Sequence, residues 1–357
     1  MSKPSMKSPA VQRIMILRLS AVGDTILSMP ILCELRRRFP KSKIAWVVGQ
    51  GAADLLRGHQ DLDDLLVLSK KDTASPVAYL RFLNQVRAWK PDTLIDAQGL
   101  TKSAWIGRYS GAKLRIGLSK SEFEGRELST WLNNTLVTPC HEQVVLRGLE
   151  LLKPLGIEDP VVQYKVPRHA ETIRSVDQKL RELRASDTWG IINVGAGWPS
   201  KIWPTERYAA VAKHLGQRWG LPSWIAWGGP QERSIAQELE QTSDGWAKMM
   251  PQTSLVELAE WVRRAKLFVG SDTGPMHLSV AVGTPTVALI GPMPSERVGP
   301  LGAMHATVQI DRLSEKERSQ RKTDMRPMLS IRSEHVQEAC DRICHEISLG
   351  KTAPKAA

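Results

Sequence analysis

The stretch Ile14-Met15-Ile16-Leu17 decides the fold of the first half, because it leads through Ser20-Ala21-Val22-Gly23 into a helical segment, residues 24–38. A buried strand, a small loop and a helix in this order open a strand–helix–strand unit. Further strands are predicted at 44–48, 65–68 and 93–96, with a helix around 79–89. The alternation predicts a parallel sheet covered by helices on both faces, with ligands at the carboxyl ends of its strands.

The second half restarts the same pattern at residue 190. A strand at 190–194 is followed by Gly195-Ala196-Gly197 and a helix at 205–219. The remaining strands are predicted at 224–227, 267–269 and 286–290, and the remaining helices at 231–241, 255–265 and 275–282. We therefore expect two doubly wound α/β domains that face a central cleft, where substrates bind preferentially.

The domain limits follow from this restart. We place the first domain at residues 1–165 and the second at 187–330, with a charged helix at 170–185 between them. Residues 331–357 are expected to form a C-terminal helix and tail that could cross back to the first domain. A chain of 357 residues is long enough for two domains of ordinary size.

The formal net charge of +12 narrows the class of partner. Such an excess favours nucleic acid, an anionic membrane or a polyanionic substrate. Nucleic acid is disfavoured, because the chain has no lysine-rich tail, no zinc-finger spacing and no aromatic motif for reading bases. The twelve tryptophans are spread through the predicted strands and helices, where packing in the core is their expected role.

Two features bear on the compartment. No apolar run reaches the roughly 18 residues that a membrane helix needs, and residues 1–12 lack the apolar stretch of a signal peptide. We therefore expect a cytoplasmic protein. The four cysteines are Cys33, Cys140, Cys340 and Cys344, and we interpret them as cytosolic thiols rather than as a zinc site.

The loop after the first strand, residues 18–24, carries one carboxylate, Asp24, at or near the start of a helix. The helix dipole stabilises a carboxylate there, so Asp24 could simply cap the helix. The functional alternative is a general base that removes the proton of an acceptor hydroxyl. The loop is not a dinucleotide fingerprint, because it has one glycine where that motif needs three.

A second strand end, residues 268–278, predicts an anion site. Pro275 is well placed as the first helical residue, so the backbone N–H groups of Thr273 and Gly274 are free to bind a pyrophosphate. His277, one turn into the helix, could donate a hydrogen bond to a phosphate oxygen, and Asp272 could accept from sugar hydroxyls. Simple capping of the helix and packing of His277 are the structural alternative.

Two other strand ends in the second half carry groups that suit a nucleotide. Gly195 and Gly197 allow the backbone to approach a ligand closely, and Lys201 supplies a mobile positive charge for a diphosphate. Glu232 could hold the two ribose hydroxyls, or it could only start its helix.

No metal is expected at the leaving diphosphate, because Lys201, His277 and a helix N-terminus are available to it. Asp61-Leu62-Asp63 matches a metal-binding Asp-x-Asp pattern, but it precedes a strand instead of following one, and we interpret it as chance. In the first half, the strand-end loop at 96–103 and the cations downstream of it would suit an acceptor that carries carboxylates and phosphates.

Together these motifs resemble glycosyltransferase family 9, the ADP-heptose:lipopolysaccharide heptosyltransferases. The resemblance covers nearly the whole chain and is strongest in four places: residues 20–24 with Pro30, 96–103, 201–204, and 272–274 with His277. It implies a GT-B fold and a metal-independent, inverting transfer of L-glycero-D-manno-heptose. The implied donor is ADP-heptose, and no cofactor is expected. The implied acceptor is the anionic, lipid-linked inner core of lipopolysaccharide, at the cytoplasmic face of the inner membrane.

Matched by position, the resemblance also implies roles for single residues. Asp24 resembles the catalytic base of the family. The implied donor-binding residues are Gly195, Gly197, Lys201, Glu232, Asp272, Thr273, Gly274 and His277, and the implied acceptor contacts are Arg18, Lys102 and Arg126. The chain departs from one family type at Ala196 and Gly197, where that type has threonines, and at 275–276, where it has Leu-Ser.

Three other functions stay open at this point. A family 9-like transferase could use another sugar or another nucleotide, such as UDP. A non-catalytic module could bind a nucleotide or an anionic glycolipid with a degenerate site. A nicotinamide dehydrogenase is a weaker alternative, because the dinucleotide fingerprint is missing.

Overall fold

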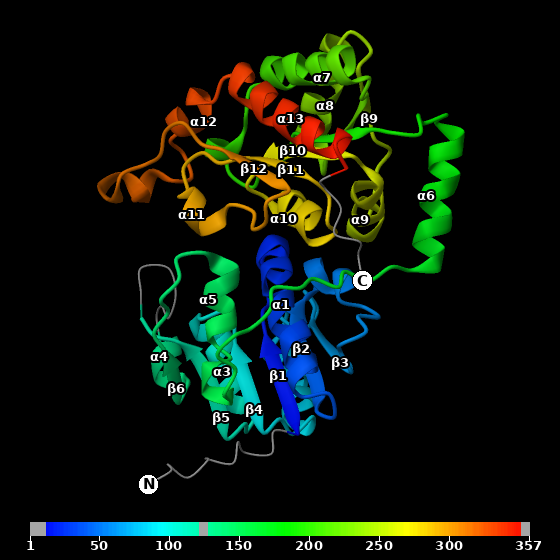
Figure 1. The fold of residues 1–357 in the computed structure, drawn as a ribbon. Coiled ribbons are helices and arrows are strands. Elements are labelled where there is room, and N and C mark those ends of the chain that lie inside the picture. The colour runs from blue at the N-terminus through cyan, green and yellow to red at the C-terminus, as the bar shows by residue number, and fades with distance from the viewer. Residues whose placement is uncertain (1–11, 121–127, 351–357) are drawn as a thin grey trace. The chain divides into compact units, whose positions relative to one another are not determined.

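The computed structural model of the protein describes residues 12–120 and 128–350. The chain divides into two compact units, Met1–Pro167 and Arg168–Ala357, which are drawn in Figure 1. Each unit holds one six-stranded sheet in which every neighbouring pair of strands is parallel. The predicted fold class, parallel α/β with a repeated doubly wound pattern, is confirmed.

The first unit has the strand order β3-β2-β1-β4-β5-β6. Its strands are β1 (Arg13–Leu17), β2 (Lys43–Gly49), β3 (Asp64–Leu68), β4 (Thr93–Asp96), β5 (Leu114–Leu118) and β6 (Thr135–Val137). Its helices are α1 (Val22–Arg38), η1 (Gln50–Leu55), α2 (Pro76–Ala88), α3 (Thr101–Tyr109), α4 (Ser129–Leu132), α5 (Val144–Glu150) and η2 (Lys153–Leu155).

The second unit has the strand order β12-β11-β10-β7-β8-β9. Its strands are β7 (Gly190–Asn193), β8 (Ser223–Ala226), β9 (Ala247–Met249), β10 (Leu267–Ser271), β11 (Thr286–Leu289) and β12 (His305–Val308). Its helices are α6 (Ala170–Glu182), η3 (Pro199–Lys201), α7 (Thr205–Trp219), α8 (Pro230–Thr242), α9 (Leu255–Arg264), α10 (Gly274–Ala281), α11 (Ser295–Val298), η4 (Glu315–Gln320), α12 (Arg326–Ser330) and α13 (Ser333–Ser348).

Both sheets follow one topological rule. In each unit the first strand lies in the middle, the next two strands extend to one side of it, and the last three extend to the other side. The direction of winding therefore reverses between β1 and β4 in the first unit and between β7 and β10 in the second. Ligands of doubly wound folds bind outside the carboxyl ends of the strands at this switch point.

Burial explains why the central strands form. All four residues of the run at 14–17 are fully buried in β1, as expected for a parallel strand that is covered on both faces. The second unit has its own core, in which Trp203 and Tyr208 pack edge to face with ring centroids 4.7 Å apart. Helix α13 packs on α7, β11 and β12, inside the second unit.

The sequence analysis missed four strands, β5, β6, β9 and β12. They are short, lie toward the sheet edges, and three of them carry a charged or titratable residue: Arg115, Lys248 and His305. Their apolar pattern is therefore too weak to predict a strand. Over the described residues, none of the helices combines the length and apolar character needed to cross a bilayer.

Candidate active site

The switch point of the first unit holds Asp24, the predicted base. Asp24 is the third residue of α1, and its Oδ2 accepts a hydrogen bond from the backbone N–H of Ala21 at 3.1 Å. The same oxygen lies 2.7 Å from Nη2 of Arg18, while the side chain stays 42% exposed. Asp24 therefore caps its helix and also presents a carboxylate to solvent, so the two interpretations of this residue are compatible.

The loop after β4, at residues 97–100, holds the loop at 18–21 in place, just before Asp24. The side-chain oxygen of Gln98 accepts hydrogen bonds from the backbone N–H groups of Leu19, at 2.8 Å, and Ser20, at 3.3 Å. Nη1 of Arg18 donates to the backbone oxygen of Ala97. Gln98 lies in the strand-end loop at 96–103 that the sequence singled out, but no role was predicted for it, although its position just after a central strand was a usable signal.

Asp96 shapes the Gln98 loop from inside the protein. It is buried and accepts hydrogen bonds from the Gly99 N–H at 3.0 Å and from Nδ2 of Asn133 at 3.1 Å. Burial raises the pKa of the Asp96 carboxyl above its usual value, although these hydrogen bonds oppose the shift. Asp96 therefore holds the loop and does not face a ligand.

The three predicted acceptor contacts are Arg18, Lys102 and Arg126. Lys102 is exposed on the second position of α3. Arg18 is tied to Asp24 and to the Gln98 loop, as described above. Arg126 lies outside the described residues. Their roles toward an acceptor stay predictions.

The switch point of the second unit brings three predicted donor-binding residues together. Nζ of Lys201, at the end of η3, lies 2.5 Å from Oδ2 of Asp272 and also donates to the Asp272 backbone oxygen at 2.9 Å. Nε2 of His277 lies 3.1 Å from Oδ1 of the same carboxylate. Asp272 follows β10 directly, and His277 is in the first half of α10. One buried carboxylate thus orients both candidate phosphate ligands.

This cluster bears on the expectations for Lys201 and Asp272. Burial alone would raise the pKa of the Asp272 carboxyl, but the charge of Lys201 and the hydrogen bond to His277 hold it well below its usual range. Lys201 is therefore not the mobile charge that its sequence position predicts, because a buried ion pair fixes its ammonium. Both oxygens of Asp272 already have a partner, and its role toward sugar hydroxyls stays a prediction.

The start of α10 has the expected character of an anion site. Thr273 is the N-cap, but its hydroxyl donates to the Ser271 backbone oxygen at 3.1 Å instead of accepting from the helix. The Thr273 side chain does not cap the helix, so it leaves the first-turn N–H groups unblocked. The helix begins at Gly274, and Pro275 is its second residue rather than its first. Backbone N–H groups at such a terminus attract phosphate.

Glu232 joins the strand ends of β7 and β8. Its Oε2 accepts a hydrogen bond from the Gly228 N–H at 2.5 Å, and burial raises the pKa of its carboxyl. The carboxylate also packs on the backbone at Gly195, where a Cβ atom would lie 2.4 Å from Oε2. At Gly197 an added Cβ would meet nothing within 4 Å. Gly195 is therefore needed for the approach of Glu232, whereas Gly197 faces open space.

An aromatic ring near Lys201 escaped the sequence analysis. Nζ of Lys201 lies 4.6 Å from the ring centroid of Trp198, and Nζ of Lys322 lies 5.7 Å from it. Cations are attracted to the face of an indole ring at such distances. Trp198 therefore gathers positive charge next to the strand ends of the second unit. Lys322 is distant in sequence and gave no local signal.

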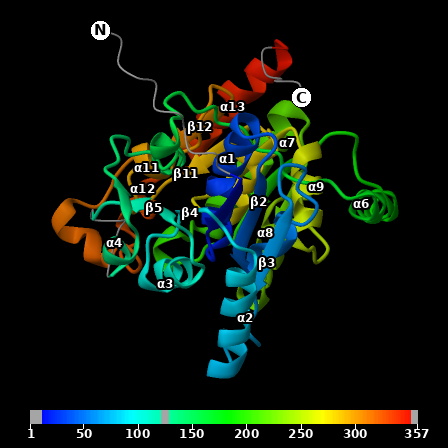
Figure 2. The ribbon, with the colours of Figure 1, turned by 90° about the horizontal axis from the view of Figure 1, so that it is seen from below.

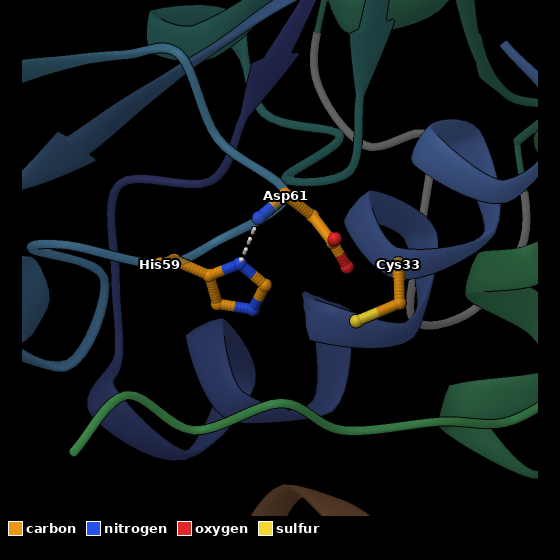
Figure 3. Close-up of side chains that lie close together, drawn as sticks. All are labelled: Cys33, His59 and Asp61. Carbon is orange, nitrogen blue, oxygen red and sulfur yellow. Dashed lines mark hydrogen bonds between the residues drawn. The ribbon is translucent and has the colours of Figure 1, made fainter. Parts of the chain in front are cut away.

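One group of metal-ligand types lies elsewhere in the first unit (Figure 3). Ligand atoms of Cys33, His59 and Asp61 all lie within 4.8 Å of one another, and the three residues are buried. Nζ of Lys165 lies 2.8 Å from Asp61 and already balances its charge. Burial raises the pKa of Cys33 to about 12 and lowers the pKa of His59 to about 4, so both are neutral near pH 7.

The Asp-x-Asp pattern has structural partners at both ends. Asp61 pairs with Lys165, as described above. Oδ2 of Asp63 accepts from Nη2 of Arg36 at 2.6 Å and from the Ile44 N–H at 2.7 Å. These contacts tie the segment before β3 to α1 and β2. They account for both carboxylates without a ligand, and the interpretation of the pattern as chance stays a prediction.

Comparison with known proteins identifies the family of this chain. Residues 79–328 match the family described as Glycosyltransferase family 9 (heptosyltransferase). The chain belongs to this family. The match spans the loop after β4, η3 and the β10–α10 junction, so it includes most of the site described above. The expected class of enzyme, a glycosyltransferase, is confirmed.

Relatives by sequence and solved structures both support this family. The lipopolysaccharide heptosyltransferase 1 of Campylobacter coli is 28% identical over 80% of this chain and 85% of its own length, and that of Salmonella typhimurium is 27% identical over 81% and 92%. The structure of a family 9 glycosyl transferase from Veillonella parvula has a TM-score of 0.81, with 23% identity over 94% of this chain and 98% of that one. E. coli heptosyltransferase WaaC with ADP has a TM-score of 0.73, with 23% identity over 93% and 100%. These structures show the fold, which is GT-B.

Proposed function

We propose that this glycosyltransferase moves heptose from ADP-L-glycero-D-manno-heptose to the inner core of lipopolysaccharide. The observation that carries the proposal is the Lys201–Asp272–His277 cluster at the switch point of the second unit, next to the uncapped start of α10. Two donors and a helix N-terminus suit a diphosphate. The curated relatives named above are lipopolysaccharide heptosyltransferases, which supports heptose and the core as donor sugar and acceptor.

In the donor site, the pyrophosphate of ADP-heptose lies against the α10 N-terminus, with Lys201 and His277 donating to its oxygens. Glu232 accepts hydrogen bonds from the ribose hydroxyls, and the open backbone at Gly197 lets the nucleotide approach closely. Asp272 keeps the two donors in place before the substrate arrives, so little reorganisation is needed when charge develops on the leaving group. Lys201 supplies positive charge that a metal would otherwise provide.

Transfer is a single displacement with inversion. The acceptor hydroxyl oxygen attacks the anomeric carbon, its proton passes to the carboxylate of Asp24, and the bond from the anomeric carbon to the diphosphate breaks to release ADP. Asp24 suits the role because its carboxylate is accessible and oriented by Arg18 at 2.7 Å. Lys102, Arg126 and Arg18 are the proposed cations for the anionic acceptor, and the enzyme works at the cytoplasmic face of the inner membrane.

The test begins with nucleotide selection. Thermal stabilisation of the protein is compared in ADP, UDP and GDP, and ADP-heptose is then incubated with a deacylated core acceptor while ADP release is measured. We expect selective stabilisation by ADP and ADP release that requires the acceptor and is unchanged by a chelator. A preference for UDP would indicate another donor, and tight ADP binding without transfer would indicate a binding module. Loss of activity in the chelator would overturn the metal-independent mechanism.

A further inference from the structure

Three large apolar side chains protrude where α3 and α4 pack together. Trp131 on α4 is 86% exposed, and Trp105 on α3 and Leu128, the N-cap of α4, are each more than half exposed. The Leu128 N–H donates to Oγ1 of Thr101, the first residue of α3, at 3.2 Å. The two helices lie side by side in both views of the ribbon (Figures 1 and 2). We call Trp105, Leu128 and Trp131 the aromatic patch.

The aromatic patch departs from the expectation that tryptophans pack in the core. Trp46, Trp203 and Trp261 meet that expectation and are fully buried. Trp105 and Trp131 instead expose their indole rings on α3, which packs on β4, and on the short helix α4, which packs on β5. Single exposed apolar residues are common, but a cluster of large ones on neighbouring helices indicates a surface that another body covers.

Among the described residues, the charge around the aromatic patch is positive. Residues 97–120 contain five lysines and arginines and no carboxylate, and residues 128–140 contain no charged side chain. Lys102, Arg108 and Lys113 are exposed. Three glutamates and Arg126 lie in 121–127, outside the described residues. A cavity of about 390 Å³ runs beside Trp105, with arginines on its wall: its lining is Arg87, Trp105, Arg108, Tyr109, Gly111 and Leu132.

We propose that the aromatic patch is the surface by which this protein docks on an anionic lipid bilayer. Indole rings prefer the boundary between lipid headgroups and acyl chains, where their apolar body is buried and their N–H stays hydrated. Exposed lysines and arginines beside them pair with anionic headgroups, and each adds binding free energy that salt screens. Because the exposed cations complement anionic headgroups, we favour a membrane over an apolar protein as the partner.

Docking through the aromatic patch would also serve the reaction. Lys102 lies on α3, one helical turn before Trp105, so both project from neighbouring positions of one helix face. A bilayer that accepts Trp105 therefore lies close to the proposed acceptor contact. This consequence rests on the proposed function, because it assumes a lipid-linked acceptor, whereas docking itself does not.

The experiment measures co-sedimentation of the full chain with phosphatidylcholine vesicles that contain or lack phosphatidylglycerol. We expect binding only to the anionic vesicles, weaker at raised salt. Trp131→Ser should weaken binding by about tenfold, the scale of burying one large apolar side chain, and Arg108→Gln should reduce the salt dependence. Val77→Ser is the matched control, because Val77 is 61% exposed in the first turn of α2 and is not part of the aromatic patch, and this variant should bind like the unchanged protein.

Activity separates this proposal from the proposed function. Trp131→Ser should keep its rate on a deacylated, water-soluble acceptor and lose rate on an acceptor embedded in anionic vesicles. Vesicle binding can be measured even if no heptose is transferred. Equal vesicle binding by Trp131→Ser and the unchanged chain would overturn the proposal. So would self-association of the unchanged chain that Trp131→Ser abolishes without any vesicle binding, since the aromatic patch would then be an interface between copies.

Discussion

At the scale of single residues, asparagine at position 24 separates the capping role of this side chain from its proposed role as a base. The amide oxygen of the substituted side chain can still accept the hydrogen bond that Oδ2 of Asp24 receives from the Ala21 N–H, but it cannot take up a proton. We expect Asp24→Asn to keep the helix cap, to lose only the partly exposed ion pair with Arg18, about 0–1 kcal/mol of unfolding free energy, and to release ADP at least ~100-fold more slowly. Turnover near the unchanged rate would remove Asp24 from the mechanism.

Alanine at the same position adds the loss of the cap. Asp24→Ala should show the same kinetic defect and also lose about 0.5–2 kcal/mol of unfolding free energy, the usual effect of removing a helix cap. Denaturant unfolding of the two variants checks this difference. If both variants were equally destabilised, the contact between Asp24 and Ala21 would contribute nothing to the stability of α1.

The buried carboxylate of Asp272 predicts a stability change that depends on pH. Asp272→Asn leaves the ammonium of Lys201 buried without a counter-charge, and we expect a loss of about 3–5 kcal/mol at pH 7. The folded-state pKa of Asp272 lies below its unfolded value of about 3.9. The stabilisation is therefore present above pH 4 and is lost as the pH falls through the folded-state pKa.

Urea unfolding across this pH range measures the Asp272 effect. The difference between the unchanged protein and Asp272→Asn should shrink steadily below pH 4. Asp244→Asn is the control, because Asp244 pairs with Lys213 at 2.7 Å on the surface of the same unit. Exposed pairs contribute about 0–1 kcal/mol, so this variant should change little. A constant Asp272 difference down to strongly acid pH would contradict the ion-pair account.

At the scale of elements, the turn after β7 and the start of α8 are in contact through Gly195 and Glu232. Alanine at position 195 would place its Cβ 2.4 Å from Oε2 of Glu232. The end of a glutamate side chain can move at little cost, so Gly195→Ala should barely affect stability. It should instead displace Glu232 from the Gly228 N–H and weaken ADP binding by roughly tenfold, the equivalent of about one hydrogen bond.

Isothermal titration with ADP measures the effect at Gly195. Glu232→Gln keeps the shape of the side chain but removes its charge. If the Glu232 carboxylate binds ADP, the ADP affinity of this variant should also fall. Unchanged ADP affinity in Gly195→Ala would show that Glu232 does not touch the nucleotide. Gly195 is not in the left-handed backbone region, so alanine at this position causes no backbone strain. The thermal stability of both variants is measured as well, to show that a change in ADP affinity is not a result of unfolding.

At the scale of the whole molecule, the two units have separate cores and separate proposed tasks. ADP should therefore stabilise the second unit by mass action, by about 2.7 kcal/mol at a concentration 100 times its Kd. Hydrogen exchange with and without ADP locates this effect. We expect slower exchange near η3, α8 and the β10–α10 junction. Equal slowing around α1 and the Gln98 loop would contradict the assignment of ADP to the second unit.

Much of the fold could be predicted from local sequence. The runs at 14–17 and 190–194 are continuous apolar segments that are followed by small loops, and this pattern is enough to predict a buried strand. The missed strands β5, β6, β9 and β12 have three to five residues and obtain their conformation from the neighbouring strand. Their backbone pairing is a property of the sheet, which no short window of sequence contains.

The sequence by itself determined which residues stand at strand ends, and so it predicted Asp24, Lys201, Asp272, His277 and Glu232 as candidates. Only the tertiary structure decided which of them meet. Lys201 and Asp272 are 71 residues apart and become partners because β7 and β10 are neighbours in the sheet. The exposure of Trp131 was equally hidden, because burial depends on what the rest of the chain covers. Contacts between distant segments follow from sheet order and packing, which local patterns do not encode.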